Sequence, residues 1–408
     1  HKMLYLAVKH AQKEPSMHLH RSLKNPEAYG GVLKGRCPGL EQFLKTTTSM
    51  DLVERVNGQY RFLAKLLKEN EFDEIRIENL VVVYANEVEP IPGVSRSVRQ
   101  SVEEAPLLDP KRLAKLRFDD QRVAYAWDRQ RFSKPRHEEI NQQETATESG
   151  EPFLFLPEQG KELGVVLVHG FSASPAEVRP FAEKLQNLGY PVIGVRLKGH
   201  GTSPWDLRER SWQDWLEPVR EGFTILSAFT PRLCLVGFST GGGLSLLLAA
   251  DQPDGLVGVA AISTPMKFRD RRIIFVPLVH TANRLVRWVS SFEGIMPFRA
   301  TEPEHPHINY RNKSVRGLYE LRIMMEELDE RLPDVQCPVI LIQGTDDPTV
   351  DPESAELIHK KLGARQKEVV MVPATRHGIL YEDTGDTQEK ILSFLAALAS
   401  KEDAGGIN

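Results

Sequence analysis

The chain has 408 residues, of which 41% are hydrophobic and 26% charged, a balance typical of a folded protein with a sizeable core. Its formal net charge of -4 gives no reason to expect a nucleic-acid partner, and its three widely spaced cysteines predict neither a disulfide framework nor a metal site. Because these cysteines favour a reducing compartment, we expect a cytoplasmic location. No apolar run reaches the ~18 residues of a membrane-spanning helix, and peripheral membrane association is left open.

Residues 1–132 are predicted to form a mainly helical N-terminal region of unknown role. Apolar residues recur at helical spacing around 40–69 and 109–132, among many charged side chains. Between these segments, the run Ile75–Tyr84 favours a strand. No motif with chemistry occurs in this region. The polar residues 133–151, rich in Pro, Gln and Glu, are typical of a linker.

Residues 152–400 alternate between apolar strands and helices. Ser174, followed by Pro175 and Glu177, predicts the capped start of one of these helices, with Glu177 closing a capping box. The predicted strands are 164–168, 191–197, 233–238, 256–262, 338–343 and 368–372. This alternation predicts an α/β fold with a doubly wound, mostly parallel sheet, in which ligand chemistry lies at the carboxyl ends of the strands.

The third of these strands runs directly into Gly237-Phe238-Ser239-Thr240-Gly241 and then into an apolar helix. A serine in Gly-x-Ser-x-Gly at a strand-to-helix turn has an exposed hydroxyl and a strained backbone, as a nucleophile requires. The alternative is a glycine-rich turn with an ordinary serine. The strand before the motif and the helix after it favour the nucleophile.

Residues from about 160 to 400 resemble serine hydrolases of the α/β-hydrolase superfamily, most closely the bacterial carboxylesterases and monoacylglycerol lipases. The motifs that carry the resemblance are His169-Gly170-Phe171, Leu197-Lys198-Gly199-His200-Gly201, the Ser239 motif, Gly344-Thr345-Asp346-Asp347 with Val350, and His377-Gly378. They occur in the order of the family and at its strand ends. The resemblance implies an α/β-hydrolase domain at 152–400, and it does not extend to the first 150 residues.

The same resemblance implies a catalytic triad. Ser239 would be the nucleophile and His377, after the last strand, the base that activates it. His169 and His200 compete for the role of base, but the family uses histidines at their positions to shape loops. An aspartate three residues before a valine selects Asp347 as the acid over its neighbour Asp346, which we interpret as a turn residue.

The tetrahedral intermediate of ester hydrolysis needs backbone donors for its oxyanion. We expect these to be the N–H groups of Phe171 and Thr240. Residues of about 264–322 interrupt the sheet pattern and, in this superfamily, would form a cap over the active site. Their apolar side chains, among them Phe268, Ile273, Phe275 and Trp288, would line an acyl pocket.

We therefore predict a serine carboxylic-ester hydrolase that works through an acyl-enzyme on Ser239, with no metal or organic cofactor. The expected substrate is a small ester or an acylglycerol, and contact with a lipid surface or with a second copy of the chain is left open. An acyltransferase or a thioesterase would use the same triad. A non-catalytic binding module on the same fold is the third interpretation, which the presence of all three triad residues disfavours.

Overall fold

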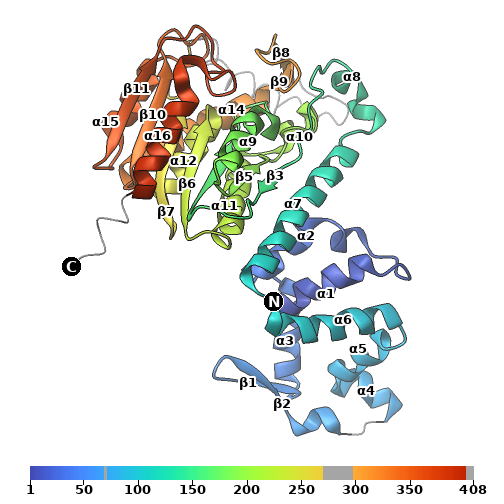
Figure 1. Cartoon of the computed structure of the whole chain (residues 1–408). Helices are drawn as coiled ribbons and strands as arrows, with labels where there is room; N and C mark the ends of the chain where they lie inside the picture. The colour runs from blue at the N-terminus through green and yellow to red at the C-terminus, as the bar shows by residue number, and fades with distance from the viewer. Residues whose placement is uncertain (69–70, 270–296, 401–408) are drawn as a thin grey trace, which may run out of the picture. The chain divides into compact units, whose positions relative to one another are not determined.

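The computed structural model describes residues 1–68, 71–269 and 297–400, which form two compact units (Figure 1). The first unit is His1–Arg112, and the second begins at Leu113, inside helix α7 (Pro110–Arg131). None of the described helices has the length and apolarity needed to cross a bilayer.

The first unit is mainly helical, as predicted. Helix α1 packs against α6, and Tyr5 and Leu6 of α1 and the small residues Ser97 and Ser101 of α6 are buried. One antiparallel pair of strands, β1 with β2, accompanies the helices. The elements are α1 (Lys2–Lys13), α2 (Pro26–Tyr29), α3 (Pro38–Ser49), β1 (Val53–Val56), β2 (Gln59–Phe62), α4 (Phe72–Glu78), α5 (Leu80–Val88) and α6 (Pro92–Glu104).

The strand predicted at Ile75–Tyr84 is wrong, because this segment forms the end of α4 and most of α5. The cause is Asn79, which is buried between the two helices. Its side-chain oxygen accepts a hydrogen bond from Val82 N and so caps α5, while its amide donates to Leu66 O. A fixed helix start and packing outweigh the strand preference of three consecutive valines.

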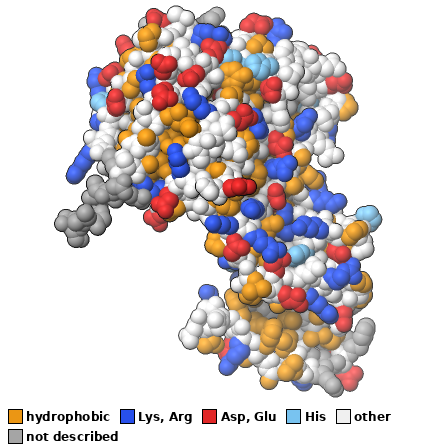
Figure 2. Space-filling model, in the orientation of Figure 1, with side chains coloured by type: hydrophobic (Ala, Val, Ile, Leu, Met, Phe, Trp, Pro, Cys, Tyr) orange, Lys and Arg blue, Asp and Glu red, His pale blue; other side chains and the backbone are white. Residues whose placement is uncertain are grey.

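Large apolar side chains are exposed on the first unit (Figure 2). Leu67 is 85% exposed, Leu107 79%, Ile77 74% and Phe62 71%. In the described part of the second unit, no large apolar side chain is more than 45% exposed. The first unit is therefore the part of the described chain that exposes large apolar side chains, a feature typical of interaction surfaces.

The second unit contains the predicted doubly wound sheet. Seven strands lie in the order β11-β10-β7-β6-β4-β5-β3, all parallel except the edge strand β3. Their bounds are β3 (Phe153–Phe155), β4 (Leu163–Val168), β5 (Val192–Val195), β6 (Arg232–Phe238), β7 (Leu256–Ile262), β10 (Val339–Gly344) and β11 (Lys367–Val372).

Helices cover both faces of this sheet (Figure 1). Because successive strand residues point to opposite faces, Val166 and Val168 of β4 join one core and Val165 and Leu167 the other. The first core includes α11 (Trp212–Ser227), α12 (Thr240–Ala250), α14 (Val315–Arg331) and α15 (Glu353–Lys361), and the second includes α9 (Arg179–Asn187) and α16 (Thr387–Ala399). Helix α10 (Pro204–Glu209) and the strand pair β8 (Phe298–Ala300) and β9 (Asn312–Ser314) complete the unit.

The segment 133–151, predicted as a linker, is bonded to the rest of the second unit. It contains α8 (Glu138–Asn141), where Asn141 accepts a hydrogen bond from Ser203. Glu144 accepts from the backbone N–H groups of Arg311 and Asn312 at 2.7 and 2.9 Å. The division of the chain therefore falls at Leu113, before the predicted boundary at residue 132. The polar composition of 133–151 could not distinguish a solvated linker from a segment whose polar groups are hydrogen-bonded to the rest of the unit.

Candidate active site

Ser239 lies between β6 and α12, at a turn that only special residues can form. Its φ of 53° and ψ of -119° are strained for a residue with a side chain. A Cβ on Gly237 would collide with the backbone oxygen of Gly241, and one on Gly241 with the backbone oxygen of Val168. Both glycines are thus required for the close contact of strand and helix, and the turn presents the Ser239 hydroxyl to a pocket.

A continuous chain of hydrogen bonds starts at this hydroxyl. Ser239 Oγ lies 3.0 Å from His377 Nε2, and His377 Nδ1 lies 2.7 Å from Asp347 Oδ2. The three residues follow β6, β11 and β10, so the carboxyl ends of parallel strands bring them together from distant parts of the sequence.

Asp347 is fully buried and richly hydrogen-bonded. Its Oδ1 accepts from the N–H groups of Thr349 and Val350 at 2.8 and 3.0 Å. Burial alone would raise the pKa of Asp347, but the hydrogen bond and charge of His377, together with these two N–H groups, outweigh it and lower the pKa. A carboxylate is therefore held ionised against the imidazole.

The competing residues named from the sequence lie elsewhere. Asp346 is exposed and accepts a hydrogen bond from Thr345. His169 is buried, with Nε2 accepting from Leu197 N and Nδ1 2.9 Å from Gly170 O, and burial lowers its pKa to about 3. Burial likewise lowers the pKa of His200, whose Nδ1 lies 3.2 Å from Lys198 O. Both imidazoles hold loop backbone in place and stay neutral.

The two predicted oxyanion donors flank Ser239. Phe171 follows β4 and Thr240 is the first residue of α12, and both line the same pocket as the serine. Among the described residues, neither N–H group is engaged in a backbone hydrogen bond outside helices and strands. The positive end of the α12 dipole adds to the field at this point.

Glu177 is a site residue that the sequence did not reveal. Its predicted capping box is wrong: the Ser174 side chain caps nothing, and a short 3-10 turn, Pro175–Glu177, stands where the helix was expected to begin. The Glu177 carboxylate instead accepts from Gly170 N at 2.7 Å and lines the pocket. Burial raises its pKa to about 7, although the Gly170 N–H and the His377 charge oppose the shift.

The pocket in front of Ser239 has a volume of about 500 Å³ and is lined by two sets of side chains, which we call its apolar wall and its charged wall. The apolar wall comprises Phe171, Phe238, Phe268, Leu318 and Leu321. Charged and polar groups form the other: Arg299, Glu302, Glu304, Asn309, Lys313 and Arg376. Of the predicted cap, 264–269 and 297–322 contribute to these walls, whereas Ile273, Phe275 and Trp288 lie outside the described residues.

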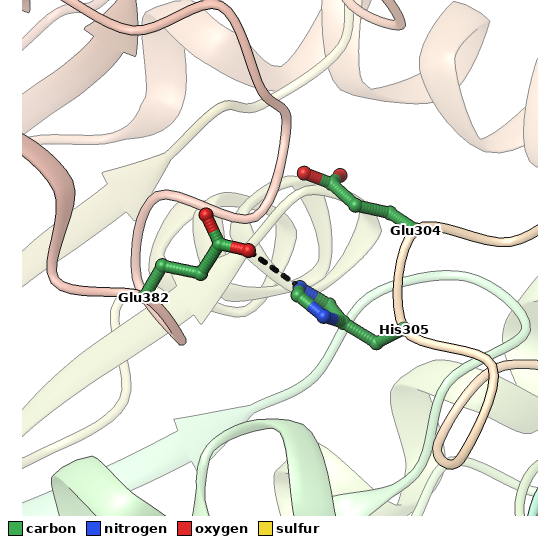
Figure 3. Close-up of side chains that lie close together, drawn as sticks. All are labelled: Glu304, His305 and Glu382. Atoms are coloured by element: carbon green, nitrogen blue, oxygen red, sulfur yellow. Dashed lines mark ion pairs between the residues drawn. The ribbon is translucent and has the colours of Figure 1, made fainter.

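Glu304, His305 and Glu382 bring three potential metal ligands within 4.8 Å of one another (Figure 3). His305 is buried, burial lowers its pKa, and its Nε2 has no hydrogen-bond partner among the described residues. However, the Arg376 guanidinium lies 2.9 Å from Glu304 and 2.7 Å from Glu382. The two carboxylates thus share this guanidinium, which occupies the place of a cation between them, and the cluster fixes the backbone beside His377 through a bond from Gly378 N to Glu304.

Known proteins resemble a large part of this chain. A family model described as serine aminopeptidase S33 matches residues 161–384. A thermostable monoacylglycerol lipase of Bacillus sp. (strain H-257) is 28% identical over 262 residues, which are 63% of this chain and 98% of that protein. A carboxylesterase of Bacillus subtilis (strain 168) is 24% identical over 249 residues, 60% of this chain and 96% of that protein.

The fold is similar to that of solved lipolytic enzymes. A structure described with the metagenome-derived lipolytic enzymes LipS and LipT superimposes with a TM-score of 0.54 at 23% identity. It covers 62% of this chain and 99% of its own. The family match leaves out the first 160 residues, as the sequence resemblance did.

Proposed function

The chain belongs to the serine aminopeptidase S33 family of α/β-hydrolases, and from this premise we propose that Ser239, His377 and Asp347 are its catalytic triad. The enzyme is a carboxylic ester hydrolase, the class of its monoacylglycerol lipase and carboxylesterase relatives. The observation that carries the triad is the unbroken hydrogen-bond chain from the Ser239 hydroxyl to the buried Asp347 carboxylate.

In the proposed mechanism, Ser239 Oγ attacks the ester carbonyl carbon while His377 Nε2 takes the hydroxyl proton. Asp347 orients the imidazole and stabilises the imidazolium. The N–H groups of Phe171 and Thr240 stabilise the oxyanion of the tetrahedral intermediate. His377 then gives its proton to the departing alcohol, which leaves an acyl group on Ser239.

The second half of the reaction repeats these steps with water. His377 takes a proton from the water as its oxygen attacks the acyl carbon, and the proton returns to Ser239 Oγ when the acid leaves. We infer that the apolar wall of the pocket holds a short or medium acyl chain of a simple ester or a monoacylglycerol. Residues 264–322 would act as the cap over this pocket.

Ser239→Ala tests the triad directly. Turnover of p-nitrophenyl butyrate should fall by about 10⁶. Ser245→Ala is the matched control, because the Ser245 hydroxyl donates a hydrogen bond to Gly241 O within α12 and does not line the pocket. Its loss should leave activity within about tenfold. An organophosphonate should add its mass to the peptide with Ser239. A folded Ser239→Ala protein that keeps a few per cent of the activity would exclude Ser239 as nucleophile.

Two alternatives use the same groups and need their own measurements. An acyltransferase or thioesterase would be detected by the products formed when water, an alcohol and a thioester substrate compete. Since the family description names an aminopeptidase, aminoacyl p-nitroanilides should be assayed beside the esters. We expect the esters to be the substrates.

We further propose that residues 1–112 supply no catalytic group and bring the enzyme to lipid surfaces. Their exposed apolar side chains support this role (Figure 2). Binding of the full chain to phospholipid vesicles, measured by co-sedimentation, tests it. A concentration-dependent dimer without vesicle binding would assign the surface to a second copy instead.

A further inference from the structure

The charged wall of the pocket contains a lysine, Lys313, that pairs with no carboxylate among the described residues. Glu302 pairs at 2.9 Å with Arg311, which does not itself line the pocket. Glu304 pairs with Arg376 at 2.9 Å. Glu302 thus has a cation partner in Arg311, and Glu304 shares Arg376 with Glu382. Lys313 has no ion pair or side-chain hydrogen bond to any described residue.

Lys313 also faces a second cation. It is the direct cross-strand partner of Arg299 in the antiparallel pair of β8 and β9, and both residues line the pocket. Side chains of directly paired residues lie on the same face of the two strands, with Cβ atoms roughly 5 Å apart, where like charges destabilise each other. Burial, and then the Arg299 charge, lower the pKa of Lys313. The protein maintains this unfavourable arrangement in the same pocket as Ser239.

From these observations we propose that Lys313, with Arg299, forms a subsite for an anionic group of the ester substrate, a carboxylate or a phosphate. An anion bound between the two side chains would relieve their repulsion and accept charge-assisted hydrogen bonds from both. The substrate would be amphiphilic, with its acyl chain on the apolar wall and its anionic end on the charged wall. This assignment rests on the proposed function, since it gives the substrate class of the same pocket.

The anionic group has two possible positions, and matched substrate pairs separate them. On the acyl side, p-nitrophenyl hexanoate is compared with the p-nitrophenyl monoester of adipic acid, which replaces the terminal methyl by a carboxylate. On the alcohol side, monohexanoylglycerol is compared with its phosphorylated counterpart. The quantity measured is the ratio of kcat/KM for the anionic substrate to that for the neutral one.

In at least one pair, this ratio should fall by about 10- to 100-fold in Lys313→Met, because a hydrogen bond to a charged group is lost. Lys313→Arg keeps the charge and should retain most of the ratio. Lys267→Met is the matched control: Lys267 pairs with Glu353 at 2.9 Å and does not line the pocket, so the ratio should not change. Equal ratios in wild type and Lys313→Met for both pairs would overturn the subsite.

A binding measurement separates this result from a failure of the proposed function. Glycerol phosphate and adipate should raise the melting temperature of the wild type more than that of Lys313→Met, whether or not neutral esters are hydrolysed. Without ligand, Lys313→Met should melt no lower than the wild type, since it removes a repulsion. Equal stabilisation of both proteins by each anion would again contradict the subsite.

Discussion

Glu177 gives the sharpest test of the electrostatics around the active site. The residue is 4% exposed, and burial raises the pKa of its carboxyl group from 4.5 to about 7. Between these two pH values the folded protein keeps a proton that the unfolded chain has released. The stability associated with Glu177 is therefore fully present below about pH 4.5 and is lost as the pH rises through about 7.

The size of this effect follows from the shift. A difference of 2.5 between the two values, 7 and 4.5, corresponds to about 3 kcal/mol of unfolding free energy lost on the alkaline side. Glu177→Gln cannot ionise and can still accept the hydrogen bond from Gly170 N. We expect the variant to gain stability over the wild type as the pH rises, by up to about 3 kcal/mol near pH 8, whereas the advantage should vanish near pH 4.5.

Urea unfolding followed by tryptophan fluorescence measures this difference in the correct part of the chain. The five tryptophans all follow Leu113, so they report on the second unit: Trp127, Trp205, Trp212, Trp215 and Trp288. Glu183→Gln, an exposed position on α9, is the control for losing a carboxylate and should show no such pH dependence. A Glu177→Gln protein that is less stable than the wild type at pH ~8 and equal to it at pH ~5 would refute the reasoning.

Two further predictions concern the triad and the start of the hydrolase unit. Asp347→Asn should lower ester turnover by about 10⁴, whereas Asp346→Asn should change it by less than about tenfold, because only Asp347 contacts His377. Steady-state kinetics of both purified variants decides this, and the reverse ranking would reassign the acid. A fragment that begins at Asp109 should fold and hydrolyse p-nitrophenyl butyrate. A fragment that begins at Glu151 lacks Asp128, the buried carboxylate that pairs with Arg196 and Arg210. It should therefore lose about 3–5 kcal/mol of unfolding free energy. Cooperative melting of the shorter fragment at the temperature of the longer one would contradict this.

The sheet and the positions of the candidate triad could be predicted because their signals are local. The Ser239 motif requires a strand, a tight turn and a helix within a few residues, and the structure has all three. Once parallel strands were recognised, their carboxyl ends had to meet at one edge of the sheet. Among the residues at these strand ends, the resemblance to the hydrolase family then selected His377 and Asp347 as the partners of Ser239.

The elements that were missed depend on contacts between distant segments. The valines after Asn79 favour a strand by composition, but a side-chain cap and a bond to Leu66 determine a helix. Polar residues at 133–151 indicated a linker, yet Glu144 bonds the backbone of Arg311 and Asn312, more than a hundred residues later. Such pairs leave no periodic pattern in a single sequence.

The same limit applies to the chemistry around the triad. Glu177 fits the pattern of a helix cap, and only the return of the loop after β4 makes it a buried carboxyl group at Gly170. Lys313 stands in an unremarkable polar run, and it becomes a candidate anion ligand because β8 places Arg299 opposite it at the pocket wall. The catalytic groups come from motifs that the reaction requires. The groups that would select the substrate come from the packing of the insertion onto the sheet, so substrate choice can change while the triad stays the same.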